Sequence, residues 1–208
     1  WISRIRAAAP DKVGLFQELG IKNYHQSSNL LNHAHLWPKA SRILPENSVS
    51  EIRHLEFMKN IEEIVGGFSI TNEENLCREE IYWRIARPSK ILDTAGIHAD
   101  CWFWEAGGQV AQKYSRRIKI WIPIHIHNPI KGLRVVPGSH LRDWPFRLET
   151  KNGLKKPVSD IVEGSIKIEE LEARPGSLVM FHDKLLHAGP LNNEGTRVSL
   201  EFTMLVNK

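Results

Sequence analysis

Cysteine is scarce in this chain: there are two among 208 residues, Cys77 and Cys101. Small domains held together by disulfides need several paired cysteines, so a disulfide framework is excluded as the basis of the fold. With so few thiols, we expect a protein of the reducing cytoplasm whose stability depends on a hydrophobic core. A chain of 208 residues is long enough to build one sizeable core.

Long apolar runs and dense basic runs are also absent. The uninterrupted apolar stretches are a few residues long, far short of the ~20 that a membrane-spanning helix needs. The formal net charge is +4, and the lysines and arginines are scattered, which does not indicate a nucleic-acid-binding surface. We therefore expect a small-molecule partner rather than a nucleic acid or a membrane. The sequence does not indicate an oligomeric state.

Helical patterns are concentrated in the first third of the chain. Residues 11–20 predict a short helix that ends at a glycine. Ser48 and Glu51 have the spacing of a capping box, and apolar residues follow at helical spacing as far as Val65. We predict a helical N-terminal part over residues 1–67.

After this helical part the pattern changes to short strands separated by glycine and proline turns. Between Ile118 and Ile126 every second residue is isoleucine, so one face of a strand is expected to be apolar. Helices followed by strands predict a mainly β protein, a sandwich or barrel with the N-terminal helices packed on one outer face. We expect one domain over residues 1–208, with its core in 68–208 and a polar insertion, 141–165, as a candidate lid.

The chemistry centres on His98 and Asp100. Residues two apart on a strand share a face, so these side chains would point at one centre, and Cys101 would point away from it. With His187 downstream, two imidazoles and one carboxylate form the set that binds metal in non-haem Fe(II) oxygenases. Three open coordination positions would then accept a 2-oxo acid through two oxygens and dioxygen through one.

Alternatives stay open at this point. A histidine and an aspartate two apart occur often by chance, and His98 with Asp100 could be a structural hydrogen-bonded pair. His182 is a rival to His187 as the second histidine. We prefer His187 because Arg197 follows ten residues later.

Arg197 is the candidate anchor for the 2-oxo acid. Residues 192–195 are a strong turn signal. A hairpin there would make His187 and Arg197 near-opposite neighbours on adjacent strands. The planar guanidinium would pair with the far carboxylate of 2-oxoglutarate, and Ser199, two residues on, would add a hydroxyl donor.

Several segments together resemble one family. They match in order and spacing over about residues 80–205, and they are Gly96-Ile97-His98-Ala99-Asp100, Trp121-Ile122-Pro123-Ile124, Gly132 through His140, Pro175 through Phe181, and His187-Ala188-Gly189-Pro190 through Arg197. The chain resembles the phytanoyl-CoA dioxygenase-like family. The most specific piece is the Val135-Val136-Pro137-Gly138-Ser139-His140 string.

The resemblance implies a double-stranded β-helix, or jelly-roll, fold of the cupin-like kind. It also implies Fe(II), 2-oxoglutarate and O2 as cofactor and co-substrates, with ascorbate as a helpful reductant. By the same resemblance, His98, Asp100 and His187 match the iron ligands, and Arg197 matches the 2-oxoglutarate anchor.

Further side chains are candidates for the interior. Trp121 and His125 share the non-isoleucine face of their strand and line the interior if the isoleucine face packs under the helices. We assign Trp121 to 2-oxoglutarate. We assign Arg84, His125 and Trp102 to the substrate, although each could equally be an ordinary core or strand residue.

The function expected from the sequence is an Fe(II)- and 2-oxoglutarate-dependent oxygenase. We expect it to hydroxylate an unactivated carbon of a small molecule with release of succinate and CO2. Two alternatives remain: a non-catalytic jelly-roll module that binds a small molecule or metal, and a cupin-like isomerase. The sequence does not name the substrate.

Overall fold

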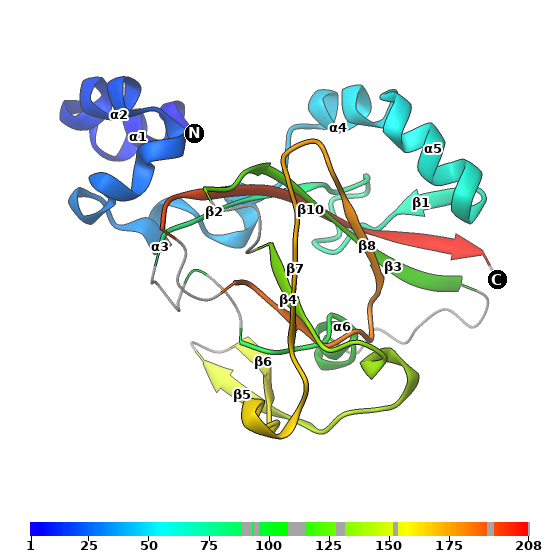
Figure 1. Ribbon diagram of the computed structural model, residues 1–208. Helices are drawn as coiled ribbons and strands as arrows, with labels where there is room; N and C mark the ends of the chain where they lie inside the picture. The colour runs from blue at the N-terminus through cyan, green and yellow to red at the C-terminus, as the bar shows by residue number, and fades with distance from the viewer. Residues whose placement is uncertain are drawn as a thin grey trace.

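The computed structural model describes residues 1–88, 93, 96–107, 115–127, 132–151, 154–190 and 194–207. The helices are α1 (Ile2–Ala8), α2 (Val13–Leu19), α3 (His33–Leu36), α4 (Glu46–Arg53), α5 (Glu56–Val65) and α6 (Cys101–Ala106). The strands are β1 (Phe68–Ile70), β2 (Tyr82–Ala86), β3 (Ser115–His125), β4 (Leu133–Val135), β5 (Phe146–Lys151), β6 (Leu154–Ser159), β7 (Glu169–Leu171), β8 (Val179–His182), β9 (His187–Ala188) and β10 (Arg197–Asn207). Figure 1 labels most of these elements.

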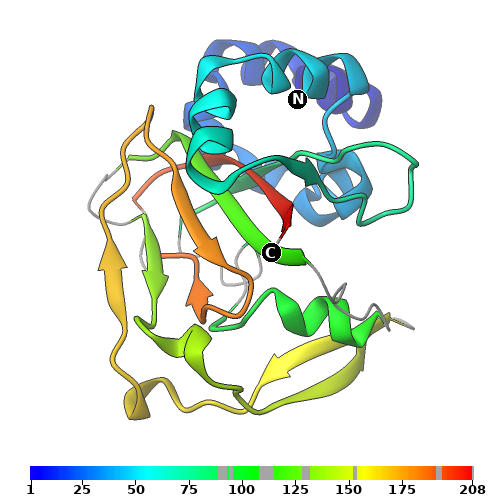
Figure 2. The same ribbon diagram turned by 90° about the vertical axis from the view of Figure 1, so that its right-hand side faces the viewer.

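Two antiparallel sheets face each other and form the jelly roll. The larger sheet runs β1–β10–β3–β8, and β2 pairs with β10 beside β1 on the same edge. The smaller sheet runs β7–β4–β9. Figures 1 and 2 show the larger sheet in the middle of the molecule, with helices above it and the smaller sheet below. This confirms the predicted mainly β fold with helices packed on one outer face.

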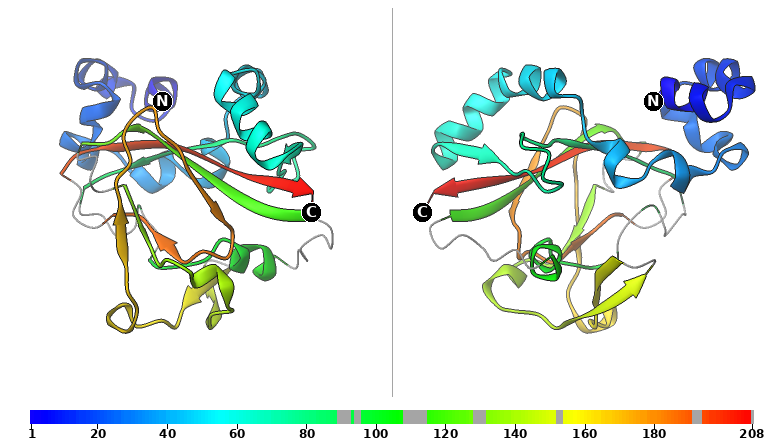
Figure 3. Two further views of the ribbon diagram at one scale, coloured as in Figure 1. Left: turned by 45° about the vertical axis from the view of Figure 1, so that its right-hand side comes forward. Right: turned by 180° about the vertical axis from the view of Figure 1, so that it is seen from behind.

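The helix-facing side of the larger sheet holds the main core. Met58 and Ile61 of α5 pack there against Ile120 of β3 and Phe202 and Met204 of β10, all at most 2% exposed. Ile118, Ile120 and Ile122 of β3 therefore face the helices, which lie above the larger sheet in both views of Figure 3. The predicted alternation ends at a register shift in the pairing of β3 with β10, and Ile124 is 49% exposed. The opposite face of β3 is left to line the interior between the sheets.

The first helices pack on a different part of the same sheet. Phe16 of α2 and Tyr24 are fully buried. Together with Trp37 they pack against Ile85 of β2. Within the described residues, no helix is long and apolar enough to cross a membrane.

The predicted capping box is wrong. Helix α4 begins at Glu46 after Pro45, so Ser48 lies inside the helix and its side chain does not cap the start. The helical stretch also divides at Leu55, which has an extended backbone and precedes α5. Pro45 is the N-cap residue, and its ring holds φ at −57°, which is compatible with a helix start, so α4 begins at Glu46, two residues before Ser48.

The predicted hairpin between His187 and Arg197 is also wrong. His187 pairs with Val135 of the smaller sheet, whereas Arg197 pairs with Ala86 of the larger sheet. The backbone N–H and C=O of His187 are bound to His98, at 2.8 and 3.0 Å, which leaves neither for Arg197. The chain therefore crosses from one sheet to the other, and the turn residues 191–193 lie outside the described residues.

The insertion 141–165 contains the β5–β6 hairpin. Phe146 of β5 stacks on Trp102 of α6, with ring centroids 5.0 Å apart and planes 17° apart. The hairpin thus packs against α6 at the bottom of the molecule in Figure 2. It covers the outer side of the segment that carries His98 and Asp100.

Gly132 marks a close approach between the strands of the smaller sheet. A Cβ at this position would lie 2.6 Å from the carbonyl oxygen of Leu171 and 2.6 Å from Ala173 Cβ. We expect Gly132→Ala to lower the free energy of unfolding by about 1–3 kcal/mol, because the backbone must move to make room. Chemical denaturation measures this. Gly14→Ala in α2 is the control, since a Cβ there meets nothing within 4 Å; equal stability of the two variants would contradict the prediction.

Candidate active site

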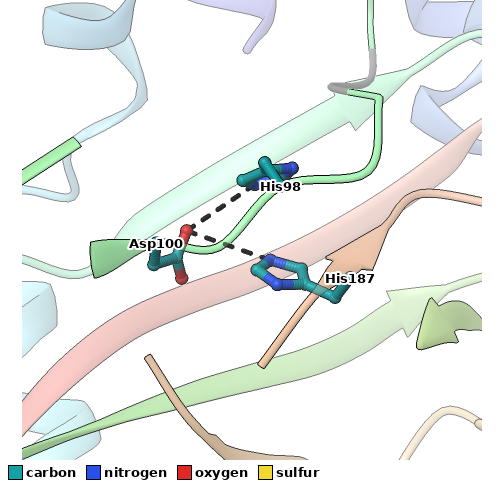
Figure 4. A group of neighbouring side chains, drawn as sticks. All are labelled: His98, Asp100 and His187. Atoms are coloured by element: carbon teal, nitrogen blue, oxygen red, sulfur yellow. Dashed lines mark ion pairs between the residues drawn. The ribbon is translucent and has the colours of Figure 1, made fainter. Parts of the chain in front are cut away.

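His98, Asp100 and His187 come together in the interior. One ligand-type atom from each lies within 4.8 Å of the others. Asp100 Oδ1 is 3.7 Å from His98 Nε2 and 3.9 Å from His187 Nε2. Figure 4 shows the three side chains converging, two from the segment before α6 and one from β9. These separations are too long for hydrogen bonds and suit donor atoms arranged around one metal ion.

The local structure explains how residues two apart meet. His98 forms an isolated antiparallel bridge with His187. Asp100 is not on a strand, because it is the N-cap residue of α6 with φ −64° and ψ −31°. The expectation of a regular strand is therefore wrong, and the carboxylate reaches the centre because the chain turns into a helix directly after the bridge. Cys101 is 8% exposed in a hydrophobic cluster, away from the centre.

Backbone carbonyls orient both imidazoles. Nδ1 of His98 lies 2.7 Å from the carbonyl oxygen of Gly96, and Nδ1 of His187 lies 2.9 Å from that of Leu185. A carbonyl oxygen only accepts, so Nδ1 of each ring carries the hydrogen and donates it. Nε2 of each ring faces Asp100, and in a neutral ring it carries the lone pair, which is the arrangement that metal-binding histidines use.

The protonation states also suit a metal. Burial lowers the pKa of His187 to about 4, with His98 acting in the same direction, so the ring is neutral at pH 7. Burial alone would raise the pKa of Asp100, but Lys119 and the two histidines outweigh it and hold this pKa below its ordinary value. His187 thus presents a neutral imidazole, and Asp100 a carboxylate, without any change of protonation.

Lys119 was missed at the sequence level. Its Nζ lies 3.6 Å from Oδ2 of Asp100, the oxygen turned away from the histidines. Burial disfavours the charge of Lys119, but Asp100 and Glu201 outweigh it and raise its pKa above the usual range. The signal that could have identified it is its position between Ile118 and Ile120, which places it on the interior face of β3.

Arg197 and Ser199 lie on the interior face of β10. Arg197 is 3% exposed and Ser199 is fully buried. Nε and Nη1 of Arg197 and Oγ of Ser199 are buried and have no hydrogen-bond partner among the described residues. Burial lowers the pKa of Arg197 to about 10, followed by the effect of Arg84, so the side chain stays charged at pH 7. Buried donors without partners are costly, and a carboxylate would satisfy them.

Trp121 connects the two parts of the site. The guanidinium of Arg197 lies 5.8 Å from the centre of the Trp121 ring. Trp121 belongs to the cluster that contains Phe181, whose ring centroid is 4.7 Å from that of His187. These aromatic contacts place Arg197 and the metal-type cluster on one continuous inner surface.

Arg84 is paired rather than free. It lies opposite Ser199 in the sheet, and its Nη2 is 3.0 Å from Oε1 of Glu201. Arg84 and Lys119 lower the pKa of Glu201 to about 2 against the opposing effect of burial. Within the part of the chain that the structure describes, Nε of Arg84 is buried and has no hydrogen-bond partner, so one donor of this side chain remains available.

The other expected residues lie elsewhere. Trp102 is 3% exposed in the cluster behind Ala99, on the side of the β5–β6 hairpin. His125 ends β3, where burial and the nearby Lys22 and His127 lower its pKa. His182 lies 2.9 Å from the carboxylate of Asp183. None of the three belongs to the His98–Asp100–His187 cluster, and the rival assignment of His182 loses its geometric basis.

A jelly roll with two histidines and a carboxylate at its inner surface defines a class of metal-site proteins. Over residues 21–197 the chain matches the model of the phytanoyl-CoA dioxygenase (PhyH) family. This match covers well over half of the sequence, and the chain belongs to that family. The resemblance noted in the sequence is thus confirmed. No curated protein matches the chain by sequence.

Solved structures share the fold at low identity. EvdO2 from Micromonospora carbonacea var. aurantiaca is 15% identical with a TM-score of 0.55, over 79% of this chain and 66% of that one. Its complex with 2-oxoglutarate is 17% identical with a TM-score of 0.53, over 79% and 65%. The non-heme alpha ketoglutarate dependent carbocyclase SnoK from nogalamycin biosynthesis is 15% identical with a TM-score of 0.50, over 76% and 58%. This chain spans about two thirds or less of the length of these structures.

Proposed function

We propose that this protein is an Fe(II)- and 2-oxoglutarate-dependent oxygenase that hydroxylates an unactivated carbon of a small molecule. The observation that supports this most strongly is the pairing of two features on one inner surface. One is the His98–Asp100–His187 cluster with both Nε2 atoms turned to the carboxylate. The other is the buried Arg197, two of whose donors have no hydrogen-bond partner among the residues that the structure describes.

Each side chain has a defined part in this proposal. His98, Asp100 and His187 hold the iron, and Arg197 with Ser199 binds the far carboxylate of 2-oxoglutarate. When bound with 2-oxoglutarate and O2, iron supplies an oxidant that can take a hydrogen atom from an unactivated carbon, with release of succinate and CO2. Trp121 and the two sheets exclude water from this inner surface, which strengthens the pairing between the charge of Arg197 and the carboxylate.

Asp100 favours hydroxylation over halogenation. A halide would need a coordination position on the metal, and in this proposal the Asp100 carboxylate fills that position. Lys119 holds the second oxygen of this carboxylate at 3.6 Å, which keeps the group in place. Arg84, with its partnerless Nε on the same inner surface, is the residue that we propose for contact with the substrate.

The test is succinate release. The purified chain, loaded anaerobically with Fe(II) and given 2-oxoglutarate and ascorbate, is exposed to air with fractionated small-molecule metabolites. We expect succinate above the level of a metal-free control, and a product that gains one oxygen atom by mass spectrometry. A product that loses two hydrogen atoms would instead indicate ring closure or desaturation.

Two rival functions give different results. A non-catalytic binding module forms no succinate with any fraction, and a cupin-like isomerase changes its substrate without consuming 2-oxoglutarate. Absence of 2-oxoglutarate binding to the metal-loaded chain would remove the basis of the proposal altogether.

A further inference from the structure

The residue before Arg197 is held from the opposite end of the sequence. Thr196 is fully buried and immediately precedes β10. The N–H of His25 donates to Oγ1 of Thr196 at 3.0 Å, and Oγ1 lies 2.9 Å from Nδ1 of the His25 ring. The N–H of Thr196 donates to the same Nδ1 at 3.2 Å. Three contacts between two residues 171 positions apart in sequence thus fix the start of β10.

This geometry requires a neutral His25. Nδ1 accepts from the N–H of Thr196, so the ring hydrogen is on Nε2 and the hydroxyl of Thr196 also donates to Nδ1. Burial lowers the pKa of His25 from 6.5, and His127 acts in the same direction. The ring is therefore in its accepting form at pH 7.

His25 itself rests on a rigid support. The preceding residue, Tyr24, is fully buried in the N-terminal aromatic cluster. Its hydroxyl lies 3.1 Å from Nδ1 of His33 and accepts from Nε1 of Trp37 at 3.3 Å. Gly195, the residue before Thr196, is also in close contact with a neighbour: a Cβ there would lie 3.2 Å from Cβ of His127.

We propose that His25 is a positioning residue for 2-oxoglutarate, and that it acts through Thr196 on the placement of Arg197. This inference rests on the proposed function, because it needs Arg197 to bind the co-substrate. His25 does not touch 2-oxoglutarate in this proposal. The N-terminal segment that contains it completes the co-substrate site of the jelly roll.

The reason lies in what holds Arg197. Its Nε and Nη1 have no hydrogen-bond partner in the described ranges of the chain, and its guanidinium makes a cation–π contact with Trp121. The direction of the side chain therefore depends on its backbone, which the bonds to Thr196 fix one residue earlier. A bidentate pair between guanidinium and carboxylate tolerates little displacement, and a shift of about 1 Å in such a group costs as much as 100-fold.

The experiment measures binding of 2-oxoglutarate by calorimetry to the full chain loaded anaerobically with Mn(II). The variants are Thr196→Val, which loses the hydroxyl and keeps the shape, His25→Ala, and His25→Asn, whose amide oxygen can take the place of Nδ1. We expect Thr196→Val and His25→Ala to bind 2-oxoglutarate about tenfold more weakly, the equivalent of one net hydrogen bond. We expect His25→Asn to recover most of this loss, and the affinity for Mn(II) to stay unchanged in all three.

A matched control separates positioning from general weakening of the fold. The hydroxyl of Thr203, also on β10 and 1% exposed, donates to Glu73 at 3.2 Å. Thr203→Val removes an equivalent buried bond, and it is expected to lower the melting temperature without changing the 2-oxoglutarate affinity. Equal loss of affinity in Thr203→Val and Thr196→Val would overturn the positioning role.

The outcomes also separate this inference from the proposed function. If Arg197→Ala leaves 2-oxoglutarate binding intact, the proposed co-substrate site is wrong. If Arg197→Ala weakens binding but Thr196→Val and His25→Ala do not, the co-substrate site stands and the role of His25 is wrong. Thr196→Val keeps this test decisive even if His25→Ala fails to fold.

Discussion

Replacing His187 with alanine is expected to leave the protein without bound iron and without succinate formation. The substitution removes one of three protein donors, and Nε2 of His187 lies 3.9 Å from Oδ1 of Asp100, within reach of a shared ion. Loss even of a supporting residue around a metal site costs about 10–100-fold in affinity, so loss of a ligand should cost at least the upper end of that range. Competition with a coloured chelator under anaerobic conditions measures the affinity. His98→Ala and Asp100→Ala should behave in the same way.

His182→Ala is the control for this experiment. His182 is close in sequence and is also a histidine, but its Nδ1 is 2.9 Å from the carboxylate of Asp183, outside the cluster. We expect this variant to keep its iron. The ligand assignment would be refuted by the reverse pattern, in which His182→Ala loses the metal and His187→Ala retains it.

The fold was predictable where the signal is repeated along the chain. Alternating isoleucines identified β3 and its helix-facing side, because every second position carries the same information. The order of helices and then short strands predicted the layers. Helix starts and strand pairings depend on single residues and on distant partners, so Pro45 displaced the expected capping box and His98 took the backbone partners that a hairpin would have used.

The candidate site was only partly visible in the sequence. The structure brings His98, Asp100 and His187 together, as residue type and resemblance led us to expect, although Asp100 reaches the centre from the start of α6 rather than from a strand. Lys119 was not identified, because the alternation along β3 places it on the interior face but does not show which group it meets there. His25 was not identified either, because its partner Thr196 is 171 residues away and the sequence around His25 does not distinguish it from other polar residues. Such contacts follow from the fold and not from spacing.

Replacing Arg197 with methionine is expected to weaken 2-oxoglutarate binding by about 30-fold or more, while iron binding stays close to that of the unchanged protein. Methionine keeps an apolar stem of similar length against Trp121 but removes the charged fork, and the loss of a buried hydrogen-bonded charge partner costs roughly 2–5 kcal/mol. The 2-oxoglutarate affinity of Arg197→Lys should lie between those of the unchanged protein and Arg197→Met, because lysine keeps the charge but cannot bind both carboxylate oxygens in the same way. Titration of 2-oxoglutarate into the anaerobic Fe(II) protein, followed by visible absorbance, measures all three affinities.

Arg134→Met provides the matched comparison for Arg197→Met. Arg134 is 5% exposed, but its donors are already used, with Nε 3.1 Å from the carbonyl oxygen of Gly189 and Nη1 2.8 Å from Glu163. Loss of Arg134 should lower the melting temperature and leave the 2-oxoglutarate affinity unchanged, because among the described residues Arg134 has no buried donor without a hydrogen-bond partner. Arg197→Met should do the opposite, since removing two buried donors without partners takes away an unfavourable term from the ligand-free fold. An Arg197→Met protein that is less stable but binds 2-oxoglutarate normally would show that these donors serve the fold, and that another cation, with Arg84 the first candidate, holds the co-substrate.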